Sequence, residues 1–394
     1  MNQEQFLSDR VNSIPPSAIR RFFDLANEMK GSVISLSIGE PDFVTPWNVR
    51  SAGIFSLKDG NTHYSPNQGF IELREAITAY LKRRFNMSYD ARSEVLVTVG
   101  GSEAIDLAIR SLINPGDEVI IPEPCFVAYK ACTLLAGGVP VPVSCSADND
   151  FILLPEDLER AITPRTKLLI IGYPNNPTGA VMSRQDLERI ADVLRDRDIF
   201  VLSDELYAEL TYPPQEHCSI SECGDLRDRT IVINGFSKAF AMTGWRIGYA
   251  VGPAIIIGAM NKIHQYAIMS SPTTAQHAAI AALSYGDEAV VEMRNEYNQR
   301  RRFVIDACRK AGLLSFEPLG AFYAFPNITA TGLSSTEFCE RFLKEEKVAI
   351  VPGNAFGECG EGYVRISYAA SMENIREAML RLNRFVGRLI NQET

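Results

Sequence analysis

Short apolar runs recur through the middle of the chain and alternate with amphipathic segments. The runs that we predict as strands cover 95–99, 118–121, 139–143, 167–171, 199–203, 230–234 and 246–251. Between them we predict helices over 103–112, 127–135, 155–161 and 184–195. Apolar strands separated by helices are typical of βαβ units, so the pattern predicts an α/β fold with a mostly parallel sheet.

The two ends of the chain have a different pattern. Before the sheet we expect a helix over 17–30, a short strand at 33–36, a turn at 39–42 and two helices within 48–86. After about residue 276, long charged helices at 288–310 and 371–388 flank short strands. We therefore predict a large three-layer α/β/α domain over 48–285 and a smaller α+β domain made of 1–47 and 286–394.

Composition narrows the possible functions. The chain has 394 residues, of which 46% are apolar and 22% charged, as in ordinary globular proteins. A net charge of −9 argues against nucleic acid and anionic membranes as partners. The first ten residues lack an apolar leader, and the longest apolar runs are too short to span a bilayer.

The cysteines and histidines do not suggest a metal site. None of the eight cysteines forms a CxxC pair, and the four histidines are far apart in the sequence. We expect reduced thiols, no bound metal and a cytoplasmic location.

Lys238 is the residue that first suggests chemistry. It lies in an apolar, small-residue segment, 236–246, with Ser237 before it and Arg246 eight positions later. Such surroundings disfavour the ammonium form and lower the pKa of an amine. A lysine of this kind can form a Schiff base with a carbonyl substrate or with pyridoxal 5′-phosphate (PLP). Taken alone, an ordinary solvated lysine is the more common case.

Polar residues follow three consecutive predicted strands, where an α/β sheet places its ligand. These residues are Asn176, Asp204 and Lys238. Asp204 needs a cationic partner if it is buried, and a pyridinium nitrogen is one, although a helix N-cap is an alternative. Asn176 could hydrogen-bond a phenolic oxygen or belong only to a turn, and Tyr207 could offer its phenol to the same ring.

An earlier strand end predicts a phosphate site. Gly100, Gly101 and Ser102 join a strand to a helix, where backbone N–H groups can approach a phosphate. The G-x-G-x-x-G fingerprint is absent, which argues against a nicotinamide-dependent dehydrogenase. Phe126 follows the next strand and could stack on a flat ring or belong to the core.

These residues lie in motifs that resemble the fold-type I PLP-dependent aminotransferases of class I and II, the aspartate-aminotransferase-like group, over essentially the whole chain. The matching motifs are 39–43 (GEPDF), 64–69 (YSPNQG), 100–104 (GGSEA), 115–119 (PGDEV), 176–179 (NPTG), 203–207 (SDELY), 237–246 and 364–368 (VRISY).

The resemblance implies a role for each matching residue. Lys238 would carry PLP and move the substrate α-proton, and Asp204 would pair with the ring nitrogen. Asn176 and Tyr207 would hydrogen-bond the phenolic oxygen, and Phe126 would stack on the ring. The remaining implied contacts are phosphate binding by Gly101, Ser102, Ser237 and Arg246, and substrate carboxylate binding by Arg365 and the Gly39 N–H.

The resemblance also implies an assembly. Tyr64 would reach the phosphate of a neighbouring subunit, so we expect a homodimer with shared active sites. The segment 16–19 would close over the substrate.

The expected reaction is ping-pong transamination, with amino acid and 2-oxo acid substrates and with 2-oxoglutarate as the expected acceptor. Some relatives that use aspartate carry a lysine at the place of Ser102, and Glu103 would repel a dicarboxylate if it faced the pocket. The aromatic run 320–325 suggests a wall near the substrate or, more commonly, core. We therefore expect an apolar or aromatic donor, or alanine, with aspartate possible.

Three other functions are compatible with this fold. A PLP-dependent C–S β-lyase and a biosynthetic aminotransferase of the N-acetyl-diaminopimelate type share most of these residues. A non-catalytic regulator would be expected to carry a DNA-binding domain, and no basic extension is present.

Overall fold

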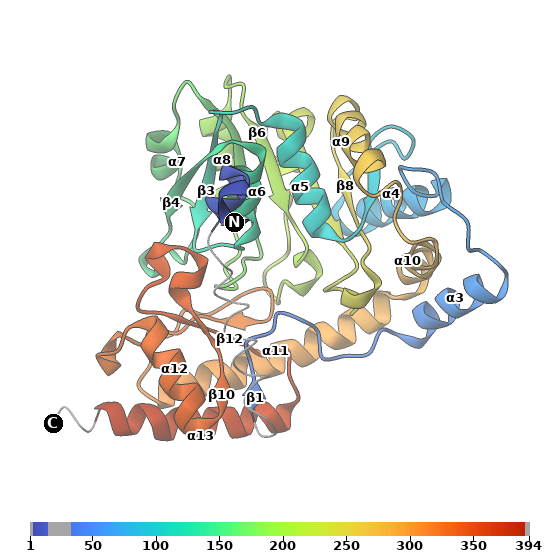
Figure 1. The fold of residues 1–394 in the computed structure, drawn as a ribbon. Helices are drawn as coiled ribbons and strands as arrows, with labels where there is room; N and C mark the ends of the chain where they lie inside the picture. Colours follow the sequence, from blue (N-terminus) through green and yellow to red (C-terminus); the bar gives the residue numbers. More distant parts are fainter. Residues whose placement is uncertain (1–2, 15–32, 391–394) are drawn as a thin grey trace.

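The computed structural model describes residues 3–14 and 33–390, and its centre is a seven-stranded sheet (Figure 1). Its strands are β2 (Val95–Thr98), β3 (Glu118–Glu123), β4 (Val139–Ser144), β5 (Thr166–Gly172), β6 (Phe200–Asp204), β7 (Thr230–Gly235) and β8 (Gly248–Val251). The order across the sheet is β2-β8-β7-β6-β5-β3-β4. Only β8 runs antiparallel to its neighbours, so the predicted α/β fold with a mostly parallel sheet is confirmed.

Helices cover both faces of this sheet because side chains alternate along each strand. In β2, Leu96 packs on one face, while Val95 and Val97 pack on the other. The first face is covered by α5 (Gly101–Leu112), α6 (Ala128–Ala136) and α9 (Ala254–Ala267). The second is covered by α4 (Ile71–Phe85), α7 (Pro155–Ala161), α8 (Arg184–Leu194) and α10 (Thr273–Tyr285).

A smaller region lies below the carboxyl edge of the sheet in Figure 1. Its sheets pair β1 (Ile34–Ser35) with β10 (Val348–Ala349), and β12 (Val364–Ser367) with β9 (Tyr323–Ala324) and β11 (Val351–Pro352). Its helices are α11 (Asp287–Lys310), α12 (Ser335–Glu346) and α13 (Met372–Ile390), which share one apolar core. Residues from both ends of the chain meet here, and the domain boundaries at 47/48 and 285/286 stay a prediction.

Two remaining segments precede the large sheet. The helix α3 (Trp47–Lys58) packs against α10, and the short η1 (Gln3–Phe6) and α1 (Asp9–Asn12) begin the described chain. The predicted helix over 17–30 and the predicted closing segment 16–19 lie outside the described residues. Within the part that the structure describes, no helix is both long and apolar enough to cross a bilayer.

The structure differs from the sequence prediction at one strand and three helices. The strand predicted from 246 begins at Gly248, because Arg246 adopts a left-handed conformation (φ 53°) that closes the turn Thr243–Trp245. The helices α9, α10 and α12 were not predicted. Neither α9 nor α10 begins with a side-chain cap or an acidic residue, and both carry long apolar stretches that hide the helical period.

Candidate active site

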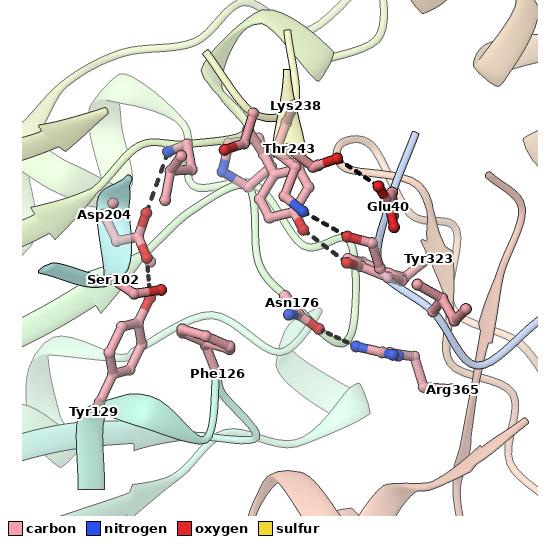
Figure 2. Close-up of a pocket in the computed structure, with 18 of the residues that line it drawn as sticks. Glu40, Ser102, Phe126, Tyr129, Asn176, Asp204, Lys238, Thr243, Tyr323 and Arg365 are labelled. Atoms are coloured by element: carbon pink, nitrogen blue, oxygen red, sulfur yellow. Dashed lines mark hydrogen bonds between the residues drawn. The ribbon is translucent and has the colours of Figure 1, made fainter. Parts of the chain in front are cut away.

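A cavity of about 350 Å³ lies between the carboxyl ends of the central strands and the smaller region. The structure brings eleven of the twelve predicted site residues to its wall. They are Gly39, Gly101, Ser102, Phe126, Asn176, Asp204, Tyr207, Ser237, Lys238, Arg246 and Arg365. Asp204 and Arg365 approach the cavity from opposite sides (Figure 2). Their grouping follows from the parallel strands, whose carboxyl ends share one edge.

Lys238 enters the cavity from the segment after β7. Its Nζ donates a 2.5 Å hydrogen bond to the Gly39 carbonyl oxygen and lies 5.8 Å from the centre of the Tyr207 ring. Burial lowers the pKa of Lys238 to about 8, although Glu40 opposes that shift. A substantial fraction of the amine is therefore neutral near pH 8 and can act as a nucleophile or base.

Asp204 is the last residue of β6 and is almost fully buried. Burial raises its pKa to about 6, while hydrogen bonds from the Tyr129 hydroxyl (2.7 Å) and the Leu206 N–H (3.2 Å) favour its charged form. Among the described residues no cation forms an ion pair with this carboxylate. A buried carboxylate that accepts hydrogen bonds but has no ion-pair partner suits a cationic ligand atom.

Arg246 and the N-terminus of α5 form a site for an anion. The guanidinium donates to the carbonyl oxygens of Thr243 (3.0 Å) and Val99 (3.5 Å) and pairs with no carboxylate in the described chain. Gly100 has φ +78°, and a Cβ there would lie 2.6 Å from Arg246 Nη2. Glycine therefore allows the close approach of backbone, arginine and a phosphate-sized ligand.

Arg365 lies on β12 with its guanidinium directed into the cavity. Its Nη1 donates to Asn176 Oδ1 at 2.8 Å, and its Nη2 donates to the Ser37 carbonyl oxygen at 2.5 Å. The charged group lies over the rings of Tyr323 (4.6 Å) and Phe356 (4.8 Å). Its Nε is buried without a hydrogen-bond partner among the described residues, which leaves donor capacity for a carboxylate.

The aromatic run 320–325 contributes one ring to the cavity wall. Tyr323 accepts or donates a 2.7 Å hydrogen bond with the Tyr207 hydroxyl, whereas Phe322 and Phe325 belong to two hydrophobic cores. The suggested aromatic wall is therefore reduced to Tyr323. A Cβ at Gly39 would lie 2.2 Å from the Tyr323 hydroxyl oxygen, so only glycine fits there in this arrangement.

Sequence reasoning missed Tyr129, whose phenol contacts Asp204. Tyr129 lies within an ordinary-looking helix, 75 positions before its partner, and no local motif marks it. Glu40 and Thr243, which hydrogen-bond each other at 2.5 Å, also line the cavity without having been predicted as site residues. Both positions lie in motifs that match the family, 39–43 and 237–246, and these motifs were the available signal.

Two further predictions concern residues outside the cavity. Glu103 does not line it, because its carboxylate contacts the Val99 N–H and His264, so the suggested repulsion of a dicarboxylate by Glu103 is wrong. Tyr64 is 82% exposed and lies away from the cavity wall of its own subunit. Its predicted contact with a neighbouring subunit is untested.

Comparisons with known proteins agree on one family. Residues 31–382 match the family model described as aminotransferase class I and II. The chain is 52% identical to YugH of Bacillus subtilis (strain 168), a candidate aminotransferase, over 97% of this chain and 98% of that protein. It is 47% identical to an aspartate aminotransferase of Pyrococcus abyssi (strain GE5 / Orsay), covering 96% and 97% of the two chains.

A solved structure gives the same result. The chain resembles the aromatic aminotransferase of Pyrococcus horikoshii OT3 with a TM-score of 0.89 and 44% identity, over 93% of this chain and 99% of that one.

Proposed function

The chain belongs to the class I and II aminotransferases, and from this premise we propose that Lys238, Asp204 and Arg365 form the centre of a PLP-dependent site. The enzyme is an aminotransferase, and its family is generally PLP-dependent. The observation that carries the proposal is the meeting of these three side chains in one cavity.

The charges of the cavity support PLP as the cofactor. In the described chain, Lys238, Arg246 and Arg365 contact carbonyl or amide oxygens but form no ion pair. Three cations without an ion pair among the described residues favour a ligand set with a phosphate and a carboxylate. Asp204, across the cavity, forms no ion pair with any described residue and would complement a protonated ring nitrogen. PLP and an amino acid together carry all of these groups.

When bound, PLP supplies an electron sink that stabilises negative charge at the substrate α-carbon. Asp204, when ionised, would hold a proton on the ring nitrogen. Lys238 would bind the cofactor and, as a free amine, would move the proton at the substrate α-carbon. Its lowered pKa of about 8 fits that role, since a base works best when its pKa lies near the working pH.

Arg365 orients the substrate through its carboxylate, with help from the amide of Asn176, to which it is hydrogen-bonded. A fixed carboxylate would hold the α-carbon in place and orient its C–H bond for proton transfer. Tyr207 and Asn176 would contact the phenolic oxygen, and Phe126 would stack on the ring. Arg246, Ser237, Ser102 and Gly101 would hold the phosphate.

For the donor we propose an amino acid with an apolar or aromatic side chain, or alanine, and for the acceptor 2-oxoglutarate. All three cations on the described cavity wall already have a role with cofactor or α-carboxylate, and Ser102 stands where some aspartate-using relatives have lysine. One argument from the sequence no longer supports this donor class, because the Glu103 carboxylate contacts His264 and does not line the cavity. The relatives include enzymes named for aromatic amino acids and for aspartate.

We further propose that two chains form a homodimer with shared active sites, and that the enzyme is cytoplasmic. Exposed large apolar side chains close together in the sequence support a subunit contact, among them Val44, Trp47, Phe55 and Tyr64. The eight cysteines are all free thiols, which agrees with a reducing compartment.

Product analysis tests the reaction. The purified enzyme with PLP, phenylalanine, leucine or alanine, and 2-oxoglutarate should form glutamate only when both substrates are present. Pyruvate released from a cystathionine-like substrate without an acceptor would support a β-lyase instead. A hundredfold preference for aspartate would contradict the proposed donor class.

A further inference from the structure

The glycine turn before α5 is held by Glu103, which is partly buried, and the fully buried His264, both outside the cavity. Glu103, in the first turn of α5, accepts the Val99 N–H through Oε2 at 2.5 Å. Its Oε1 lies 2.7 Å from Nδ1 of His264 on α9, which lies beside α5 (Figure 1). Both carboxylate oxygens are therefore used away from the free N–H groups at the start of the helix.

The direction of this carboxylate matters for an anion. An acidic side chain in the first turn is attracted to the positive end of the helix and would compete there with a phosphate. His264 removes that competition, because its Nδ1 gives the carboxylate a buried hydrogen-bond partner on another helix.

The same contacts fix the peptide groups around Val99. Its N–H donates to Glu103, while its carbonyl oxygen accepts from Arg246. Gly100 and Gly101, the first residues of the phosphate turn, follow directly. A shift of the Glu103 carboxylate would therefore move both the turn and the arginine that faces it.

His264 has no evident reason to be buried other than this contact. It is 0% exposed, and its Nε2 has no hydrogen-bond partner among the described residues. Burying an imidazole nitrogen without a partner is unfavourable, so an apolar side chain would suit a purely structural position better.

We propose that Glu103 and His264 are positioning residues for the cofactor phosphate, which they assist through the Val99–Gly101 turn without contacting it. The inference rests on the proposed PLP site. It separates two roles of the turn: binding of the phosphate, which depends on the pair, and binding of the ring, which does not.

The test compares PLP with pyridoxal, which lacks the phosphate, as ligands of the cofactor-free full-length chain. His264→Leu removes the partner of Glu103, and His264→Asn keeps an N–H near the position of Nδ1. Glu103→Ala removes both contacts. Glu103→Gln keeps an acceptor for the Val99 N–H, and its NH2 group can donate to Nδ1 when His264 carries its proton on Nε2. His277→Asn, on α10, which covers the other face of the sheet, is the matched control.

His264→Leu and Glu103→Ala should weaken PLP binding about tenfold and change pyridoxal binding less than about twofold. His264→Asn and Glu103→Gln should stay within about threefold of wild type for both ligands. Retained pyridoxal binding also shows that a variant is folded.

Three results would overturn the inference. An equal loss of PLP and pyridoxal binding would mean that the pair only supports the fold. Tighter PLP binding by Glu103→Ala would mean that the carboxylate acts only as a repelling charge. A wild-type chain that binds neither ligand would overturn the proposed cofactor, and this inference with it, whereas the first two results leave the cofactor intact.

Discussion

The Tyr129 hydroxyl donates a 2.7 Å hydrogen bond to the Asp204 carboxylate and so joins the helix after β3 to the end of β6. This bond favours the charged form of Asp204 against the effect of burial, which raises its pKa to about 6. The charge that is to hold the cofactor ring nitrogen therefore depends on a residue that no sequence motif indicated.

Tyr129→Phe should raise the pKa of Asp204 further, because one hydrogen bond to the carboxylate is lost. A raised pKa means that more of the carboxyl group is protonated near neutrality. We expect kcat/KM to fall about tenfold at pH 7 and to recover partly at pH 9, where Asp204 is ionised again. Tyr266→Phe, at a position that is 89% exposed, is the control, and an equal loss at both pH values would contradict this explanation.

Lys238 makes a second pH dependence measurable. Its folded pKa of about 8 lies below the ordinary value of 10.5, so the reactive neutral amine is lost as pH falls below about 8. The rate at which the cofactor-free chain captures PLP should rise about tenfold per pH unit up to pH 8 and then level off. The measurement is a stopped-flow series from pH 6.5 to 10, above the titration of Asp204. A rate that keeps rising to pH 10 would show an unperturbed lysine.

The charge and the planar geometry of Arg365 contribute separately to substrate binding, and two variants distinguish them. Arg365→Lys keeps the cation but loses the planar fork, and Arg365→Gln loses the charge as well. We expect the KM values for donor and acceptor to rise about tenfold in the lysine variant and about a hundredfold in the glutamine variant. Steady-state kinetics with both substrates varied measure this. Unchanged KM values with a reduced kcat would place the substrate carboxylate elsewhere.

The proposed shared site predicts a specific behaviour of mixed subunits. If Tyr64 reaches into the active site of the other subunit, each site takes Lys238 from one subunit and Tyr64 from its partner. Lys238→Ala and Tyr64→Phe then change different subunits of the same site. When the two variants are refolded together, hybrid dimers should contain one site without either change and recover activity beyond that of the Tyr64→Phe protein alone. Light scattering should give twice the 43.7 kDa of one chain. A monomeric active enzyme would contradict the assembly.

The sequence predicted most of the central sheet because its strands are short apolar runs between amphipathic helices. Asn176, Asp204 and Lys238 could be placed together since parallel strands bring their carboxyl ends to one edge. That reasoning could not predict the direction in which each side chain points. Glu103 lies one position from the cavity wall, yet it faces His264, which is 161 positions away.

Other features could not be predicted from the sequence for the same physical reason. Tyr129 and Tyr323 acquire their roles from contacts with residues far along the chain, Asp204 and Tyr207. The helices α9 and α10 have no side-chain cap at their N-termini and pack apolar residues against other elements, so tertiary contacts define them more than local pattern.

The central claim is that Lys238 carries PLP and that the cavity performs two half-reactions. The most direct measurement is the absorbance spectrum of the PLP-loaded enzyme as single amino acids, and then 2-oxoglutarate, are added. The account predicts that the band of lysine-bound PLP is lost with an apolar or aromatic amino acid and restored by the oxo acid, and that Lys238→Ala lacks the band while the exposed Lys262→Ala keeps it. A wild-type spectrum with no such band, or a band that no amino acid converts, would contradict it.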